Sequence, residues 1–155
     1  MKLFAYGTLM TAEGFRTALG PRADAMKYRV ARLKGWRRVW DTSREEWSGG
    51  VLNLEPSAGA SVVGVLIDGL SEEDMEILDE QESTHLPREQ VLVELAGGAA
   101  ETAEVYWRRE GNHTGPPSAR YLAVVLGRAR EAGDEVFASV LSDSVDAAGR
   151  PTRFI

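Results

Sequence analysis

Short apolar segments alternate with polar breaks that contain glycine or proline along most of the chain, and this pattern predicts many short strands and a few helices. The first apolar run, Lys2–Tyr6, has the length of a strand. It is followed by a segment with helical spacing, Thr11–Leu19, which ends at Gly20-Pro21. Further strands are expected at Met26–Leu33, Trp36–Trp40, Val51–Glu55, Ser61–Ile67, Arg88–Leu95 and Glu101–Trp107, with breaks at residues 34–35, 56–59 and 97–98.

Signals for helix starts predict the remaining helices. Ser71 precedes three acidic residues and is placed to cap a helix that runs to about Gln81. Ser118 is placed to cap a second helix that ends near Gly133, and Asp134 to cap a last one.

The last helix is expected to reach about Leu141, and the tail from Ser142 to be irregular. Strands and helices interleave too unevenly for a doubly wound parallel sheet. The pattern favours an α+β fold in which a few helices flank a mixed, curved, barrel-like sheet. A chain of 155 residues fits a single domain over residues 1–155.

Composition narrows the class of protein. With 43% hydrophobic and 27% charged residues the chain is globular. Its 18 basic and 24 acidic residues give a net charge of −6, which disfavours nucleic acid as a partner. The absence of cysteine excludes disulfides and thiolate chemistry and suits a reducing cytoplasm, where we expect the protein to reside. The apolar runs are too short to predict a signal peptide or a membrane span.

Several motifs that carry chemistry in other proteins are missing. The chain has no phosphate-binding glycine loop of either common type and no G-x-S-x-G nucleophile motif. Its two histidines, His85 and His113, lack the spacing of a metal site. We therefore expect no metal and no cofactor, and any chemistry has to come from carboxylates, hydroxyl groups and backbone N–H groups.

The segment Tyr6-Gly7-Thr8-Leu9 connects the first strand to the first helix. Backbone N–H groups at such a junction face one side, and they suit a carboxylate or a developing oxyanion. Gly7 allows a ligand to approach the chain closely. The simpler interpretation is a tight turn with Tyr6 in the core, and these four residues alone favour it.

Glu82 differs from the other acids near it because it follows the periodic part of its helix, just before the pattern breaks at residues 83–87. A carboxyl group buried there would have a raised pKa, as a general acid–base requires. The alternative is a solvated helix end. His85 is expected at the surface or hydrogen-bonded in a loop, and Tyr121 in the core with a partner for its hydroxyl group.

Five short motifs in one order resemble the γ-glutamylcyclotransferase-like family. The resemblance covers roughly residues 2–133. The five matching segments are Tyr6-Gly7-Thr8-Leu9, Val63-Gly64-Val65-Leu66-Ile67, Leu78-Asp79-Glu80-Gln81-Glu82, the strand pair Val91-Leu92-Val93 and Ala103-Glu104-Val105-Tyr106, and Pro117-Ser118-Ala119-Arg120-Tyr121.

The resemblance implies an enzyme that converts a small γ-glutamyl compound to 5-oxoproline and a free amine. Glu82 matches the family's catalytic glutamate. Tyr6, Gly7, Thr8 and Leu9 match its substrate-binding loop, and Tyr121 is a candidate wall of the pocket. The chain departs from the family pattern at Ser83 and Leu86, where the family often has glycine and tyrosine, so we expect a changed pocket wall there.

Two other functions stay open. The first is a non-catalytic domain with the same fold that binds a small molecule or a partner protein. The second is an unrelated carboxylate-dependent hydrolase, which requires a second acid across the site from Glu82. The sequence identifies neither the leaving amine nor the oligomeric state.

Overall fold

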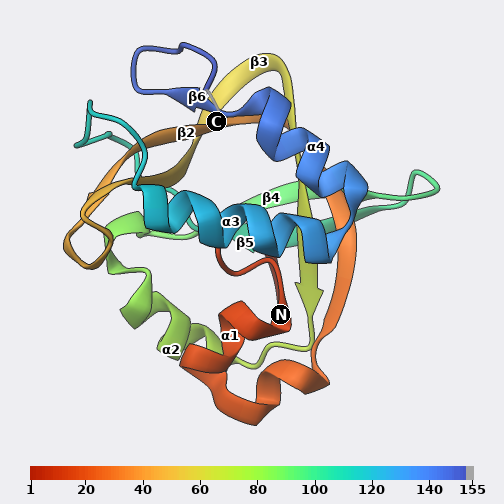
Figure 1. The fold of residues 1–155 in the computed structure, drawn as a ribbon. Coiled ribbons are helices and arrows are strands. Elements are labelled where there is room, and N and C mark those ends of the chain that lie inside the picture. Colours follow the sequence, from red (N-terminus) through yellow and green to blue (C-terminus); the bar gives the residue numbers. More distant parts are fainter. Residues whose placement is uncertain (153–155) are drawn as a thin grey trace.

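Two long strands form the framework of the protein. In the computed structural model, which describes residues 1–152, β2 (Lys27–Arg44) and β3 (Gly49–Asp68) pair antiparallel along most of their length (Figure 1). The short turn η2 (Glu45–Trp47) joins them. Most of their apolar residues are buried, and Trp40 and Leu66 are fully buried.

Three shorter strands close the sheet. β1 (Lys2–Ala5) pairs antiparallel with β3 and parallel with β5 (Ala100–Val105). β5 pairs antiparallel with β4 (Glu89–Leu95), and β4 pairs with β2, which completes a circuit of five strands. This arrangement confirms the predicted α+β fold with a mixed, barrel-like sheet.

Four α-helices flank the sheet in the described residues. Their bounds are α1 (Ala12–Leu19), α2 (Glu72–Gln81), α3 (Ala119–Ala132) and α4 (Asp134–Asp143), with 3-10 turns at η1 (Gly20–Ala25) and η3 (Ser83–His85). In Figure 1, α3 lies across the molecule with α4 beside it, α1 and α2 lie below, and the segment that joins β1 to α1 passes beneath α3. No helix in residues 1–152 combines the length and the apolar character needed to cross a membrane.

The predicted breaks at residues 34–35 and 56–59 do not separate strands. Lys34 pairs with Ser61 and Trp36 pairs with Pro56, so residues 57–60 bulge out opposite Gly35 and the ladder then resumes. Gly35 and Gly59 have φ values of 84° and 81°, which glycine adopts without strain. A bulge and a turn use the same residue types, and only the partner strand decides between them.

The structure also corrects the last helix and the tail. Gly133 is the N-cap residue of α4, and Asp134 is its first helical residue. The helix extends to Asp143, and β6 (Val145–Asp146) then adds to β2 in parallel, so part of the tail expected to be irregular is ordered. Residues 153–155 of that tail lie outside the described residues.

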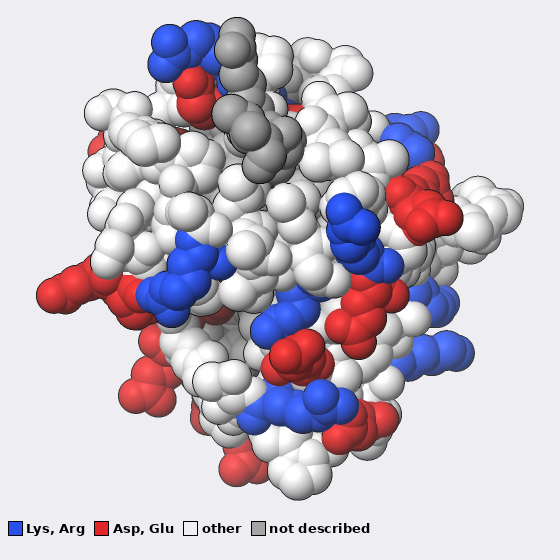
Figure 2. Space-filling model, viewed as in Figure 1, with Lys and Arg blue, Asp and Glu red and all other residues white. Residues whose placement is uncertain are grey.

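Charged side chains of both signs are interspersed on the face shown in Figure 2. Several charged side chains of the protein form pairs, such as Lys2 with Glu101 at 2.8 Å and Arg29 with Glu101 at 3.0 Å. Such surface pairs add little stability each.

The start of α2 generates a stability prediction. The Ser71 hydroxyl group accepts a hydrogen bond from the Asp74 N–H, and the Asp74 carboxylate accepts one from the Ser71 N–H. Ser71→Ala removes the first bond, and we expect it to lower the free energy of unfolding by about 1 kcal/mol. Urea unfolding measures this change. Ser83→Ala, at an exposed serine, is the control, and equal effects of both substitutions would contradict the capping role.

Candidate active site

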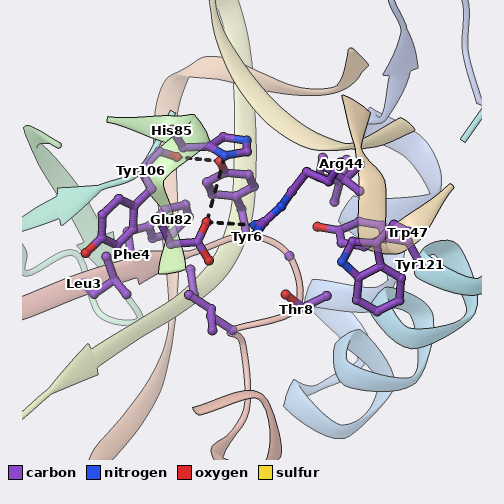
Figure 3. A pocket seen from close by; sticks show the side chains of 15 residues that line it. Leu3, Phe4, Tyr6, Thr8, Arg44, Trp47, Glu82, His85, Tyr106 and Tyr121 are labelled. Carbon is purple, nitrogen blue, oxygen red and sulfur yellow. Dashed lines mark hydrogen bonds and ion pairs between the residues drawn. The ribbon is translucent and has the colours of Figure 1, made fainter. Parts of the chain in front are cut away.

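A pocket with about 510 Å³ of empty space, partly open to solvent, lies where β1 ends, beside the end of α2 and the β2–β3 hairpin (Figure 3). Aromatic and apolar side chains make most of its wall, and a few polar groups converge on it, as is usual for small-molecule sites. Its lining residues are Leu3, Phe4, Ala5, Tyr6, Gly7, Thr8, Leu9, Arg44, Trp47, Val51, Leu52, Glu82, His85, Tyr106 and Tyr121.

The segment Tyr6–Leu9 leaves β1 and forms one wall. The Tyr6 side chain is buried, and its hydroxyl group donates a hydrogen bond to the Tyr106 carbonyl oxygen. A β-carbon on Gly7 would lie 2.9 Å from the Tyr121 hydroxyl oxygen, so glycine leaves the room that this tyrosine occupies. The Tyr6 side chain is thus in the core, as the simpler interpretation expects, and the same segment also lines the pocket.

Glu82 lies at the opposite side, where α2 ends. Its N–H donates to the Leu78 carbonyl oxygen at 2.8 Å, and η3 then turns the chain away from the helix. Its side chain is 18% exposed and points into the pocket (Figure 3). Burial raises the pKa of the Glu82 carboxyl group above its usual value, the Arg44 guanidinium opposes this rise, and Glu46 adds to it.

Arg44 is a site residue that the sequence analysis missed. It ends β2, and its Nη1 atom lies 3.8 Å from Oε2 of Glu82. Its Nη2 atom contacts Glu46 at 2.6 Å and donates to the Gln81 carbonyl oxygen at 3.2 Å. No motif marks this arginine, because the strand hairpin brings it to Glu82 from a distant part of the chain.

Two tyrosines complete the wall. Tyr121 is buried, and its ring packs edge-to-face against Trp40 and Trp47, with centroid distances of 5.8 and 5.0 Å. Burial raises the pKa of the Tyr121 hydroxyl group, which keeps it neutral. The Tyr106 hydroxyl group donates to Oδ1 of Asp79 at 2.7 Å. Both rings are thus held in place before any ligand binds.

His85 is not at the surface. It is 3% exposed, it lines the pocket, and its Nδ1 atom lies 2.8 Å from the Thr84 hydroxyl oxygen and 3.9 Å from Glu82. Burial, together with the nearby Arg44 charge, lowers its pKa to about 4, so the ring is neutral at physiological pH. The contact with Glu82 is therefore between a carboxyl group and an uncharged imidazole.

The two departures from the family pattern do not change this wall. Ser83 and Leu86 are both exposed and neither lines the pocket. Among residues 1–152, Glu82 is the only carboxylate in the lining, which gives no support to a hydrolase with paired carboxylates. The described residues contain no group of three or more His, Asp or Glu side chains arranged to hold a metal ion.

Comparison with known proteins assigns the chain to a family. The model of the family described as gamma-glutamyl cyclotransferase, AIG2-like, matches residues 3–123, and the chain belongs to that family. A search of curated proteins found no significant match.

Solved structures share the fold. A structure named gamma-glutamyl cyclotransferase is 22% identical, with a TM-score of 0.76 over 99% of this chain and 94% of its own. An uncharacterized protein from Homo sapiens is 24% identical, with a TM-score of 0.78 over 99% of this chain and 90% of its own. YkqA from Bacillus subtilis is 20% identical, with a TM-score of 0.75 over 90% of this chain and 52% of its own.

The buried histidine generates a prediction about acid stability. The unfolded chain protonates His85 below a pH of about 6.5, whereas the folded protein keeps it neutral to about 4. The free energy of unfolding therefore falls as the pH drops from 6.5 to 4, by as much as about 3 kcal/mol from this group. The difference between wild type and His85→Asn, measured by urea unfolding across this range, should change by that amount. His113→Asn is the control. If the difference in the free energy of unfolding between wild type and His85→Asn does not vary with pH, His85 is not the buried, neutral group that the structure shows.

Proposed function

We propose that this protein is a cyclotransferase that converts a small γ-glutamyl compound to 5-oxoproline and a free amine, with Glu82 as the general acid–base. The observation that carries this proposal is that a largely buried carboxyl group with a raised pKa shares one pocket with the Tyr6–Leu9 segment. The family membership of the chain and the name of one structural relative support the same reaction type.

The proposed reaction is intramolecular. The α-amine of the γ-glutamyl group attacks its own γ-carbonyl carbon, a five-membered lactam forms, and the C–N bond to the attached amine breaks. A pocket that holds the folded-back conformer supplies much of the acceleration, because both reacting groups belong to one molecule. The aromatic wall formed by Tyr106, Tyr121 and Trp47 is suited to enclose such a conformer.

Glu82 is placed for two proton transfers. As a carboxylate it accepts a proton from the attacking amine, and as the resulting acid it donates this proton to the leaving nitrogen. The raised pKa assists the second step, while the positive charge of Arg44 favours the ionised form needed for the first. The oxyanion formed at the γ-carbonyl carbon requires hydrogen-bond donors, and the backbone N–H groups of residues 7–9 are the candidates.

A pair of isosteric substitutions tests the role of Glu82. Glu82→Gln keeps the shape of the side chain but cannot accept the proton, and we expect it to lower kcat by at least ~100-fold. Glu80→Gln, on an exposed glutamate of the same helix, is the matched control. The assay measures 5-oxoproline release from γ-glutamyl amino acids, γ-glutamylamines and glutathione. Near-normal turnover by Glu82→Gln would exclude the role. Binding without turnover by the wild type would favour the non-catalytic domain.

The electrostatics predict a pH profile. Because Glu82 has to be ionised to accept a proton, kcat/KM should fall as the pH drops through its pKa, which burial places above the ordinary 4.5. Arg44→Met removes a positive charge that lowers the pKa of Glu82, so the fall in kcat/KM at acidic pH should move to higher pH. Arg44→Lys keeps the charge, so kcat/KM should fall at nearly the same pH as in the wild type. Arg37→Met, which removes an arginine elsewhere on β2, is the control. A shift to lower pH in Arg44→Met would contradict the arrangement.

A further inference from the structure

Three backbone carbonyl groups of the Tyr6–Leu9 segment, those of Tyr6, Gly7 and Thr8, have hydrogen-bond donors outside the pocket. The Tyr6 carbonyl oxygen accepts from Nε of Arg38 at 2.9 Å. The Gly7 carbonyl oxygen accepts from the Met10 N–H at 3.3 Å. The Thr8 carbonyl oxygen accepts from Nη1 of Arg128 at 2.6 Å. Neither arginine is among the residues that line the pocket, and Arg128 lines an adjoining hollow that shares Thr8 and Glu82 with it.

Arg38 is a fully buried cation, and its position is determined by several contacts. Its other nitrogen atoms donate to the Val63 carbonyl oxygen at 2.7 Å and to the Ser139 hydroxyl oxygen at 3.0 Å. The Ser139 hydroxyl group in turn donates to the Asp143 carboxylate at 2.8 Å. Burial lowers the pKa of Arg38 to about 10, so it remains charged at neutral pH. Burying a cation is costly, and here the cation holds backbone carbonyl groups of the sheet and of the segment beside the pocket.

The Thr8 carbonyl group occupies a space that a glycine leaves free. A β-carbon on Gly14 of α1 would lie 2.0 Å from the Thr8 oxygen and 2.6 Å from Nη1 of Arg128. Gly14 is the third residue of a helix, where alanine would be the better helix former. The glycine therefore allows the carbonyl oxygen of Thr8 to sit between α1 and the arginine from α3.

In a trans peptide unit the C=O and the following N–H point in opposite directions. A Tyr6 carbonyl held by Arg38 turns the Gly7 N–H the other way, and a Thr8 carbonyl held by Arg128 does the same for the Leu9 N–H. Within residues 1–152, the N–H groups of residues 7, 8 and 9 donate no hydrogen bond to another part of the chain. Free backbone donors beside a pocket are suited to an oxygen acceptor on a ligand.

We propose that Arg38 and Arg128, with the space left by Gly14, are positioning elements that hold the Tyr6 and Thr8 carbonyl groups away from the pocket. The Gly7 and Leu9 N–H groups are thereby directed into the pocket, where they bind a carboxylate or a developing oxyanion. The proposal rests on the reaction proposed above for the oxyanion, but the orientation of the N–H groups is a property of the free protein. If either carbonyl turned inward, it would place a negative dipole where the ligand carries negative charge.

A steric test uses a pair of identical substitutions in helices. Gly14→Ala pushes on the Thr8 carbonyl group, whereas Gly127→Ala in α3 adds a methyl group with no atom within 4 Å. We expect Gly14→Ala to lower kcat for 5-oxoproline release by about tenfold or more, with KM within about threefold, because donors to a developing oxyanion act mainly in the transition state. Gly127→Ala should match the wild type. Equal kcat values for both variants would overturn the role of Gly14.

Substitutions at Arg128 test the hydrogen bond itself. Arg128→Met removes the donor to Thr8, Arg128→Lys keeps a charged donor, and Arg130→Met alters an exposed arginine on the same helix. We expect kcat to fall in Arg128→Met, to recover in part in Arg128→Lys, and to be unchanged in Arg130→Met. A lower melting temperature with unchanged kcat in Arg128→Met would mean that the arginine is structural only.

A second readout separates this inference from the proposed reaction. Titration of the 15N-labelled protein with L-glutamate and with 5-oxoproline should move the amide proton resonances of Gly7 and Leu9 downfield in the wild type, and less in Gly14→Ala and Arg128→Met. If the wild type releases no 5-oxoproline from any substrate but shows these shifts, the proposed reaction fails and the orientation of the N–H groups stands. Absence of the shifts in the wild type overturns the inference.

Discussion

The antiparallel ladder between β2 and β3 fixes where each part of the pocket lies. It brings Arg44 and Trp47, at the hairpin end, to the side of the pocket where Glu82 lies. It also gives β1 its antiparallel partner, so the segment that follows β1 leaves the sheet at a defined point. The closed circuit of strands leaves little freedom between these elements, and the polar groups of the site are therefore arranged before a ligand binds.

Three ionisable side chains in and behind the pocket, Glu82, His85 and Arg38, are placed at a cost to the stability of the fold. Burial raises the pKa of Glu82 and lowers the pKa values of His85 and Arg38, so each of these groups is less favourable when charged than it would be in water. The fold compensates in a different way for each group. Arg44 lies beside Glu82, His85 stays neutral, and Arg38 is surrounded by carbonyl and hydroxyl oxygens. Such opposed pKa shifts in one small region are typical of functional sites.

Two sets of residues determine the conformation around residues 6–9, an inner layer that lines the pocket and an outer layer that contacts the inner one from the far side. The inner layer is the segment itself, with Gly7 leaving space for Tyr121. The outer layer consists of groups that touch the segment from behind, from β2, α1 and α3. A substitution of Arg38 is expected to act through the backbone, because Arg38 is fully buried and does not line the pocket. Gly14 and Arg128 also lie outside the pocket, and they line an adjoining hollow that it meets at Thr8 and Leu9.

Local patterns in the sequence indicated most of the element types and the cap at Ser71. The order of the family motifs singled out Glu82 as the candidate acid. These features depend on residues close together in the chain, and their spacing is visible without a structure. The burial of His85, the contact between Arg44 and Glu82, and the two arginines behind residues 6–8 depend on strands and helices that meet only after the sheet closes. The long ladder also turned two predicted turns into one bulge, because pairing with a partner strand outweighs the local preference for a turn. The sequence thus indicated Glu82, Tyr121 and the Tyr6–Leu9 segment as parts of the site. Tertiary structure added Arg44 and His85 to the pocket and decided how these groups face one another, since packing between distant segments leaves no periodic signal in the chain.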